Sequence, residues 1–206
     1  MPAERNARFV VLEGGDATGK TTQVARLAQR LRAANLRVAT TFEPGATALG
    51  RQIRSLVLDG DIAVDPIAEA LLMATDRAQH MVEVVRPALA RGDWVVSDRF
   101  VPSSLAYQGV GRGLGVAEIE QLNELATGGI EPDMVIVLDA TPERARQRIV
   151  AGRDRMEGEG DAFILAVHEA YRDLARSRGW AVVDADGTPD EVAEAIWAVV
   201  QERFEL

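Results

Sequence analysis

The sequence predicts an α/β fold in which a five-stranded parallel sheet carries helices on both faces. Short apolar runs alternate with longer segments of helical periodicity along the chain. This alternation is typical of parallel strands joined by crossover helices. A glycine-rich loop, Gly14–Thr21, also joins the first apolar run to the first helical segment. Together these two observations favour the doubly wound arrangement, whose ligands bind at the carboxyl ends of the strands.

The glycine-rich loop reads G-x-x-x-x-G-K-T and follows the apolar run Phe9–Leu12. A strand, this loop and then a helix are typical of a phosphate-binding loop, whose backbone N–H groups and helix N-terminus face an anion. Lys20 would place its ammonium against the outer phosphates, and Thr21 would offer its hydroxyl to Mg²⁺. The pattern therefore indicates a P-loop NTPase, with an ordinary glycine turn before a helix as the alternative.

Lys20 is the only lysine in the chain, and every other basic residue except the two histidines is an arginine. At the position where a phosphate loop uses lysine, this chain therefore has lysine and not arginine. Lysine carries a compact ammonium on a flexible side chain, whereas the guanidinium of arginine is planar. This choice of residue supports the phosphate-binding interpretation.

The elements are expected in a regular order. The strands are residues 8–13, 37–42, 94–97, 134–138 and 180–183. The helices are residues 19–34, 47–58, 66–91, 103–107, 116–127, 162–178 and 189–204, and one more opens at 141–143.

Local signals justify these boundaries. The first helix has apolar residues at helical spacing and ends at Asn35–Leu36. Asp65–Pro66 predicts a helix start, because a capping side chain precedes a proline at the first helical position. Pro87 predicts a kink in that helix, since proline lacks the N–H that an interior position needs. Glycines predict a loop at 108–113, and glycines among charges predict a mobile loop, a short lid, at about 152–161.

The composition limits the classes of function. The chain has 206 residues, is 47% hydrophobic, carries a net charge of −9 and contains no cysteine. An acidic chain is a poor candidate for non-specific nucleic-acid binding, and a chain without cysteine has neither disulfides nor thiolate metal sites. The N-terminus lacks the apolar core of a signal peptide, and no apolar run is long enough to span a bilayer. We therefore expect a cytoplasmic protein that has neither a nucleic acid nor a membrane as partner.

Polar residues stand where the expected strands end. Glu43 follows the second strand, Asp98–Arg99 follows the third and Asp139 follows the fourth. With the phosphate loop, these positions predict a crevice at one edge of the sheet. Phosphoryl transfer needs further positive charge for an acceptor and for closure over it. The candidate arginines are Arg77, Arg99, Arg148, Arg153 and Arg155, although each of them could also be an ordinary surface or structural arginine.

Six stretches carry a resemblance to a known family. They are EGGDATGKTT, FEPGAT, ATDRAQH, SDRFVPSSLAYQGVGRG, VLDATPE and GRDRME. In this order and spacing the chain resembles the bacterial thymidylate kinases over about residues 8–200, and the stretch that begins at Asp98 is the most specific. The resemblance implies a single P-loop nucleoside monophosphate kinase domain over 1–206. It also implies transfer of phosphate from ATP to dTMP, giving ADP and dTDP for dTTP synthesis, in a homodimer that uses Mg²⁺.

The resemblance also implies roles for individual residues. The catalytic residues would be Asp16, Lys20, Arg99 and Arg155, and the Mg²⁺ ligands would be Thr21 and Asp98. ATP would bind to Gly14, Gly15, Asp16, Ala17, Thr18, Gly19, Lys20, Thr21, Thr22, Arg148 and Arg153. The dTMP would bind to Glu43, Met73, Arg77, Asp98, Arg99, Ser104, Tyr107 and Gln108, with Arg99 on its phosphate and Arg77 on thymine.

The chain departs from the family pattern at three positions. Phe42 stands where the family often has arginine before Glu-Pro-Gly, and Met73 stands where a phenylalanine commonly stacks on thymine. Methionine can contact a ring through its polarisable sulfur, with a less defined geometry. Ala17 stands where the loop often has arginine or glycine, so the catalytic arginine should come from the lid.

Other readings of the phosphate loop remain. Another P-loop small-molecule or nucleoside monophosphate kinase is one, and a catalytically inactive nucleotide-binding module is another. A GTPase-like switch would read guanine with Asn-Lys-x-Asp, which this chain cannot contain because its single lysine lies in the phosphate loop.

Overall fold

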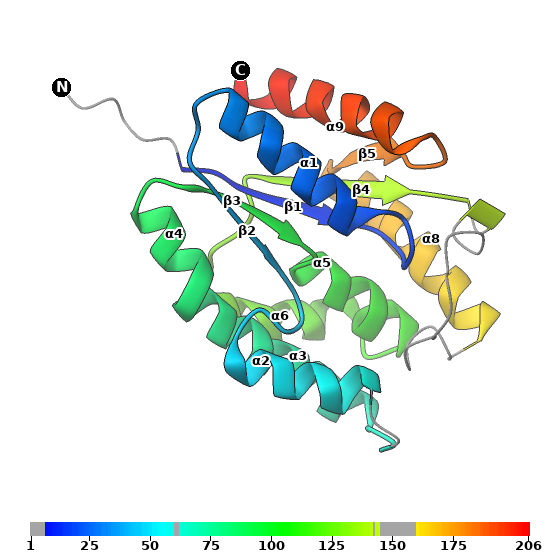
Figure 1. Cartoon of the computed structure of the whole chain (residues 1–206). Helices are drawn as coiled ribbons and strands as arrows, with labels where there is room; N and C mark the ends of the chain where they lie inside the picture. The colour runs from blue at the N-terminus through cyan, green and yellow to red at the C-terminus, as the bar shows by residue number, and fades with distance from the viewer. Residues whose placement is uncertain (1–6, 60–61, 142, 145–159) are drawn as a thin grey trace.

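The structure, a computed structural model, describes residues 7–59, 62–141, 143–144 and 160–206. Its centre is a five-stranded sheet in which every neighbouring pair is parallel, with strand order β2-β3-β1-β4-β5 (Figure 1). The strands are β1 Phe9–Glu13, β2 Val38–Phe42, β3 Trp94–Asp98, β4 Met134–Asp139 and β5 Ala181–Asp184. The predicted parallel sheet of five strands is confirmed.

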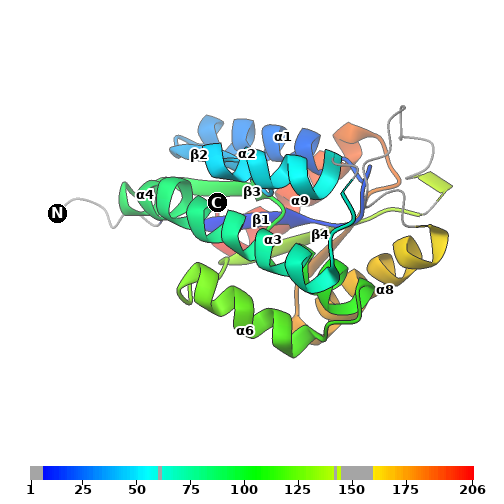
Figure 2. The same ribbon diagram turned by 90° about the horizontal axis from the view of Figure 1, so that it is seen from below.

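Helices cover both faces of the sheet (Figures 1 and 2). One face carries α1 (Lys20–Ala33) and α9 (Pro189–Phe204), and the other is covered mainly by α3 (Pro66–His80), α4 (Arg86–Ala90), α6 (Val116–Thr127) and α8 (Asp161–Arg178). The shorter α2 (Ala48–Arg54) packs against α3. The described chain contains no helix of the length and apolarity that crossing a membrane requires.

The core lies on both sides of the sheet because the side chains of each strand alternate between its faces. In β1, Val10 and Leu12 pack with α1 and α9, whereas Phe9 and Val11 pack with the segment that follows α3. All four are essentially inaccessible to solvent. A strand that is apolar at every position is typical of a parallel sheet covered on both faces.

Two helical stretches contain π-helical turns. In the first, the chain stays helical from α3 through the π-helical turn η2 (Met81–Val85) into α4, as expected for residues 66–91, and Pro87 does not end the helix. A wider turn just before a proline relieves the clash between its ring and the preceding carbonyls. The second stretch is α5 (Val101–Ser104), which continues as the π-helix η3 (Leu105–Gly111). Residues 108–111, expected as loop, are therefore helical. Gln108 and Gly109 are buried, and the packing of η3 against α6 and α8 outweighs the low helix propensity of its glycines.

The register of the strands brings their carboxyl ends level. Asp98 of β3 lies opposite both Leu12 of β1 and Phe42 of β2, and Glu13 lies opposite Val137 of β4. The loops after β1, β2 and β3 therefore leave the same edge of the sheet side by side. This edge is where the sequence predicts a crevice.

Candidate active site

The phosphate loop packs closely against the sheet and α8. Gly14 has φ +133°, and a Cβ there would lie 2.5 Å from the backbone oxygen of Leu138. A Cβ on Gly15 would lie 2.5 Å from the ring of His168 on α8. Only glycine fits this approach, because side chains rarely adopt that φ and the neighbouring atoms fill the space. The loop then leads into α1 through Gly19, so its N–H groups and the helix N-terminus share one cavity.

Lys20 bends back over this loop and is almost fully buried. Its Nζ donates to the backbone oxygen of Gly15 at 2.6 Å and lies 3.4 Å from the hydroxyl of Thr18. Burial, and then the positive charge of Arg99, lower the pKa of Lys20 to about 8. The ammonium is thus held in a place where a phosphate group would stabilise its charged form.

Thr21 and Asp98 form the most direct candidate for a magnesium site. The hydroxyl of Thr21 donates to Oδ2 of Asp98 at 2.5 Å, although the two residues lie on α1 and at the end of β3. Both offer hard oxygen atoms, which Mg²⁺ prefers. The described residues contain no cluster of three or more His, Cys, Asp or Glu side chains suited to a metal. Two protein oxygen ligands are compatible with Mg²⁺, because this ion usually keeps several of its water ligands and also binds the phosphates of the substrate.

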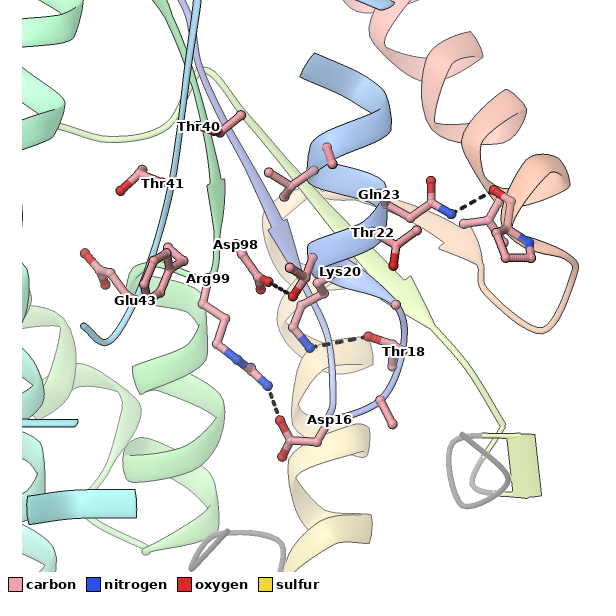
Figure 3. A pocket seen from close by; sticks show the side chains of 18 of the residues that line it. Asp16, Thr18, Lys20, Thr22, Gln23, Thr40, Thr41, Glu43, Asp98 and Arg99 are labelled. Carbon is pink, nitrogen blue, oxygen red and sulfur yellow. Dashed lines mark hydrogen bonds and ion pairs between the residues drawn. The ribbon is translucent and has the colours of Figure 1, made fainter. Parts of the chain in front are cut away.

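Arg99 connects the loop after β3 to the phosphate loop. It adopts φ +72°, which is unusual for a residue with a side chain. Its guanidinium pairs with Asp16 (Figure 3) and donates to the backbone oxygen of Gly14 at 3.1 Å. Asp16 also accepts from the Tyr107 hydroxyl at 2.9 Å. Burial pushes the pKa of Asp16 upward, but the charges of Arg99 and Lys20 outweigh it and hold that pKa below its usual value.

Glu13 supports Arg99 indirectly, through two hydroxyl groups that contact both residues. This fully buried carboxylate accepts from the backbone N–H of Phe100 at 2.7 Å, and its Oε2 accepts from the hydroxyls of Ser103 and Tyr171 at 2.7 and 3.0 Å. Both hydroxyl oxygens in turn accept from Arg99, at 3.1 and 3.2 Å. Burial raises the pKa of Glu13, and the charge of Arg99 opposes this. The unusual backbone conformation of Arg99 is therefore supported on both sides.

Arg77 is buried in a second polar cluster under the turn that follows β2. All three of its guanidinium nitrogens donate hydrogen bonds, and His80 completes the cluster by contacting Glu43 at 2.7 Å. The partners of Arg77 are the carboxylate of Glu43, the side-chain oxygens of Ser104 and Asn123, and the backbone oxygen of Phe100. Arg77 is thus not a surface arginine. Its guanidinium nitrogens already donate hydrogen bonds to protein groups around the site.

Two adjoining cavities meet at this edge of the sheet. The larger, of about 1050 Å³, is lined by the phosphate loop from Asp16 to Thr22, by the end of β2, by Asp98 and by the start of α9. The smaller, of about 100 Å³, is lined by apolar and polar side chains that include Met73, Ser104, Tyr107 and Gln108. The residues that border both are Asp16, Glu43, Arg54 and Arg99.

The structure thus gathers most of the predicted site residues at one place. The predicted residues from Asp16 to Thr22 and Asp98 border the larger cavity, and Met73, Arg77, Ser104, Tyr107 and Gln108 border the smaller. Gly14 and Gly15 form the start of the same loop. Arg148, Arg153 and Arg155, and the expected lid up to residue 159, lie outside the described residues, and α8 begins at the last residue of that expected segment, Asp161.

Several site residues were missed in the sequence. Arg54 ends α2, lies between the two cavities and donates to the backbone oxygen of Pro44 at 3.1 Å. The sequence held a partial signal, because Arg54 lies at helical spacing from Thr47 and Gly50 and therefore on the same face of the helix. Tyr171 had no such signal, since it reaches Glu13 from 158 positions away.

Comparisons with known proteins agree with this geometry. A family model described as thymidylate kinase matches residues 12–196. Similar proteins named thymidylate kinase come from Synechococcus sp. (strain JA-2-3B'a(2-13)), with 48% identity over 96% of each chain, and from Deinococcus radiodurans, with 44% identity over 95% of this chain and 97% of its own. A third, from Prochlorococcus marinus (strain MIT 9313), is 44% identical over 97% of this chain and 96% of its own.

Proposed function

Because this chain belongs to the thymidylate kinase family, we propose that its two adjoining cavities hold the two substrates of that reaction. The chain is an enzyme that transfers the γ-phosphoryl group of ATP to dTMP, producing ADP and dTDP for nucleotide biosynthesis. The observation that carries the proposal is the border between the cavities, where Arg54 and Arg99 place positive charge. Phosphoryl transfer in line needs donor and acceptor to meet at such a point.

On the donor side, the phosphate loop binds ATP through its backbone N–H groups. Lys20 leaves the Gly15 oxygen and turns its ammonium to the outer phosphates. Thr21 and Asp98 would hold Mg²⁺, which would supply positive charge next to the transferring phosphoryl group. The base of ATP lies towards the start of α9, where Pro189 and Val192 line the larger cavity.

On the acceptor side, Arg99 and Arg54 bind the phosphate of dTMP. Arg99 is already held in place by Asp16 and by the groups that Glu13 orients. Its side chain therefore loses little conformational entropy when it binds an anion. Arg54 is exposed and supplies the charge that the family often places at the position of Phe42. The Phe42 ring, 44% exposed, lines the larger cavity without offering a donor.

The smaller cavity accommodates the nucleoside of dTMP. Met73 contacts the base face through its sulfur, and Tyr107 lies beside the sugar. Ser104 accepts from Arg77 at 3.0 Å, which leaves its own hydrogen to donate to a base carbonyl. Arg77 therefore acts on the base mainly by polarising this hydroxyl, and Gln108 supplies the acceptor.

The catalytic arginine is proposed to be Arg155, because the described phosphate loop has Ala17 and contains no arginine. Replacing Arg155 with alanine should lower kcat by about 10³-fold, the lower end of the range for an arginine finger, with a smaller change in the KM for dTMP. Arg153→Ala is the matched control and should cost less. Steady-state kinetics measure both, and near-normal kcat in Arg155→Ala would contradict the assignment.

The acceptor is tested by coupling ADP release to absorbance with dTMP, dUMP, dCMP, dAMP and dGMP in turn. Turnover should be fastest with dTMP. Comparable turnover with a purine nucleotide would support a different nucleoside monophosphate kinase, and ATP binding without turnover on any acceptor would support an inactive binding module.

A homodimer is proposed to form through the exposed side of α3. Ile67, Leu71 and Val82 are 61%, 51% and 60% exposed and lie at a spacing close to one helical face. Leu71→Asp should shift a dimer to monomers in sedimentation velocity, because a buried carboxylate lacks a partner there. Leu206→Asp, at another exposed leucine, is the matched control. A wild-type monomer at micromolar concentration would contradict this.

Three further expectations remain predictions. They are the cytoplasmic location, the absence of a nucleic-acid partner, and the single domain over 1–206 with a lid at about 152–161.

A further inference from the structure

Glu69 on α3 is a charged residue that no step of the reaction uses, yet its side chain is completely buried. Its Oε1 accepts from Nε2 of Gln108 at 2.9 Å. Arg112 holds the same carboxylate from the other side, with Nε 3.2 Å from Oε1 and Nη2 2.9 Å from Oε2. A buried ion pair contributes little net stability, because removing both charges from water is costly. We therefore expect a functional role for the Glu69–Arg112 pair.

The partner of Glu69 is the residue that lines the acceptor cavity. An ionised carboxylate has no hydrogen to donate and can only accept. The amide of Gln108 must therefore turn its nitrogen to Glu69 and its oxygen away from it. The two orientations of a glutamine amide exchange its oxygen and its nitrogen, which are similar in size. Without a partner such as Glu69, packing alone would not select one of them.

The oxygen of Gln108 is left as an acceptor in the cavity. Gln108 is 2% exposed and borders the smaller cavity, and no donor among residues 7–59, 62–141, 143–144 and 160–206 reaches its Oε1. An acceptor at a cavity wall that has no donor among these residues favours a ligand that brings an N–H to it. Thymine and uracil carry a hydrogen on N3, whereas cytosine presents a lone pair there.

We propose that Glu69, held by Arg112, is a positioning residue that determines pyrimidine specificity by fixing the orientation of the Gln108 amide. This inference rests on the proposed placement of the dTMP base in the smaller cavity. The fixed oxygen accepts from N3–H of a 2,4-dioxopyrimidine and repels the N3 lone pair of cytosine. Glu69 does not touch the base and acts only through Gln108.

The test replaces Glu69 by glutamine, whose amide can face Gln108 with either its oxygen or its nitrogen. The ratio of kcat/KM for dTMP to that for dCMP should fall by about 10- to 100-fold, since a site that hydrogen-bonds one edge of a ligand rejects the wrong edge strongly. The ratio for dTMP to dUMP should not change, because these two bases share the same N3 edge. A pocket that had merely loosened would lose contact with the thymine methyl and change this second ratio as well.

A double-mutant cycle shows whether Glu69 acts through Gln108. In the background of Gln108→Met, which has no amide to orient, Glu69→Gln should leave the dTMP-to-dCMP ratio unaltered. If Glu69→Gln does not fold, Arg112→Lys provides the milder variant, since it keeps the charge but loses the two-point contact. It should shift the same ratio by about 2- to 5-fold.

Two results overturn the inference: an unchanged dTMP-to-dCMP ratio in a folded variant, and an equal change in the dTMP-to-dUMP ratio. Failure of the proposed function is separate, because it would appear as wild-type enzyme that does not phosphorylate dTMP.

Discussion

Arg99→Met should lower kcat/KM for dTMP by about 10⁴-fold, within the range that a charged group at a transferring phosphoryl contributes. The variant removes the guanidinium that borders both cavities. It also leaves the Asp16 carboxylate without its ion-pair partner, so this carboxylate would repel the incoming phosphate. Steady-state kinetics with each substrate varied in turn measure the effect. The KM for dTMP should rise while the KM for ATP changes little.

Two controls accompany this variant. Arg176→Met changes the net charge equally at an exposed pair with Asp173 and should leave kinetics unaltered. Arg99→Lys keeps the charge but cannot reach Asp16, Gly14 and Ser103 with one rigid fork, so it should recover only part of the loss. Thermal unfolding of each variant separates a loss of function from a loss of fold. A rise in the KM for ATP with an unchanged KM for dTMP would place Arg99 on the donor and not on the acceptor.

Motifs and strand ends in the sequence were sufficient to predict that the phosphate loop and the Asp98–Arg99 strand end lie at the same edge of the sheet. These residues are predictable because a strand, a loop and a helix that are consecutive in the chain carry their geometry with them. The parallel register then brings the ends of β1 and β3 together without further information. Local pattern and topology agree at these positions.

The residues that support the site were not predictable in the same way. Glu13 reads in the sequence as the end of an apolar run, and its partners Ser103 and Tyr171 come from α5 and α8. The Glu69–Arg112 pair joins α3 to the segment after η3, and neither residue belongs to a phosphate motif. Such contacts depend on how helices pack on the sheet, which side-chain periodicity in a single helix does not specify. The π-helical turns at Met81–Val85 and Leu105–Gly111 were missed for the same reason.

Acylation of Lys20 should abolish activity, and Mg-ATP should prevent it. Lys20 carries the only side-chain amine in the sequence, so an amine reagent has only the N-terminal α-amine as a second target. Since burial and Arg99 lower the pKa of Lys20 to about 8, close to the value of about 8 for an α-amine, the two groups are similar in basicity and differ mainly in access. The α-amine should react first, because Lys20 is almost fully buried.

Bound ATP should change this chemistry because its phosphates favour the ammonium form and cover it. The second acylation should almost stop with saturating Mg-ATP, and activity should fall in step with the second adduct alone. Intact-mass spectrometry beside the kinase assay measures both, and Lys20→Met, which has one target, calibrates the first adduct. Equal rates of second acylation with and without bound Mg-ATP would refute the placement of Lys20.

The same pKa predicts how ATP affinity depends on pH. If the complex holds Lys20 charged while the free enzyme has a pKa of about 8, binding takes up a proton above that pH. The affinity should therefore be constant well below pH 8 and fall as the pH rises through it, by at most about tenfold per pH unit. Calorimetric titration between pH 7 and 9.5 in two buffers of different ionisation enthalpy measures both the affinity and the proton uptake. Lys20→Met binds more weakly but should lose this pH dependence, because a thioether does not titrate, and a slope that persists in the variant would assign the proton to another group.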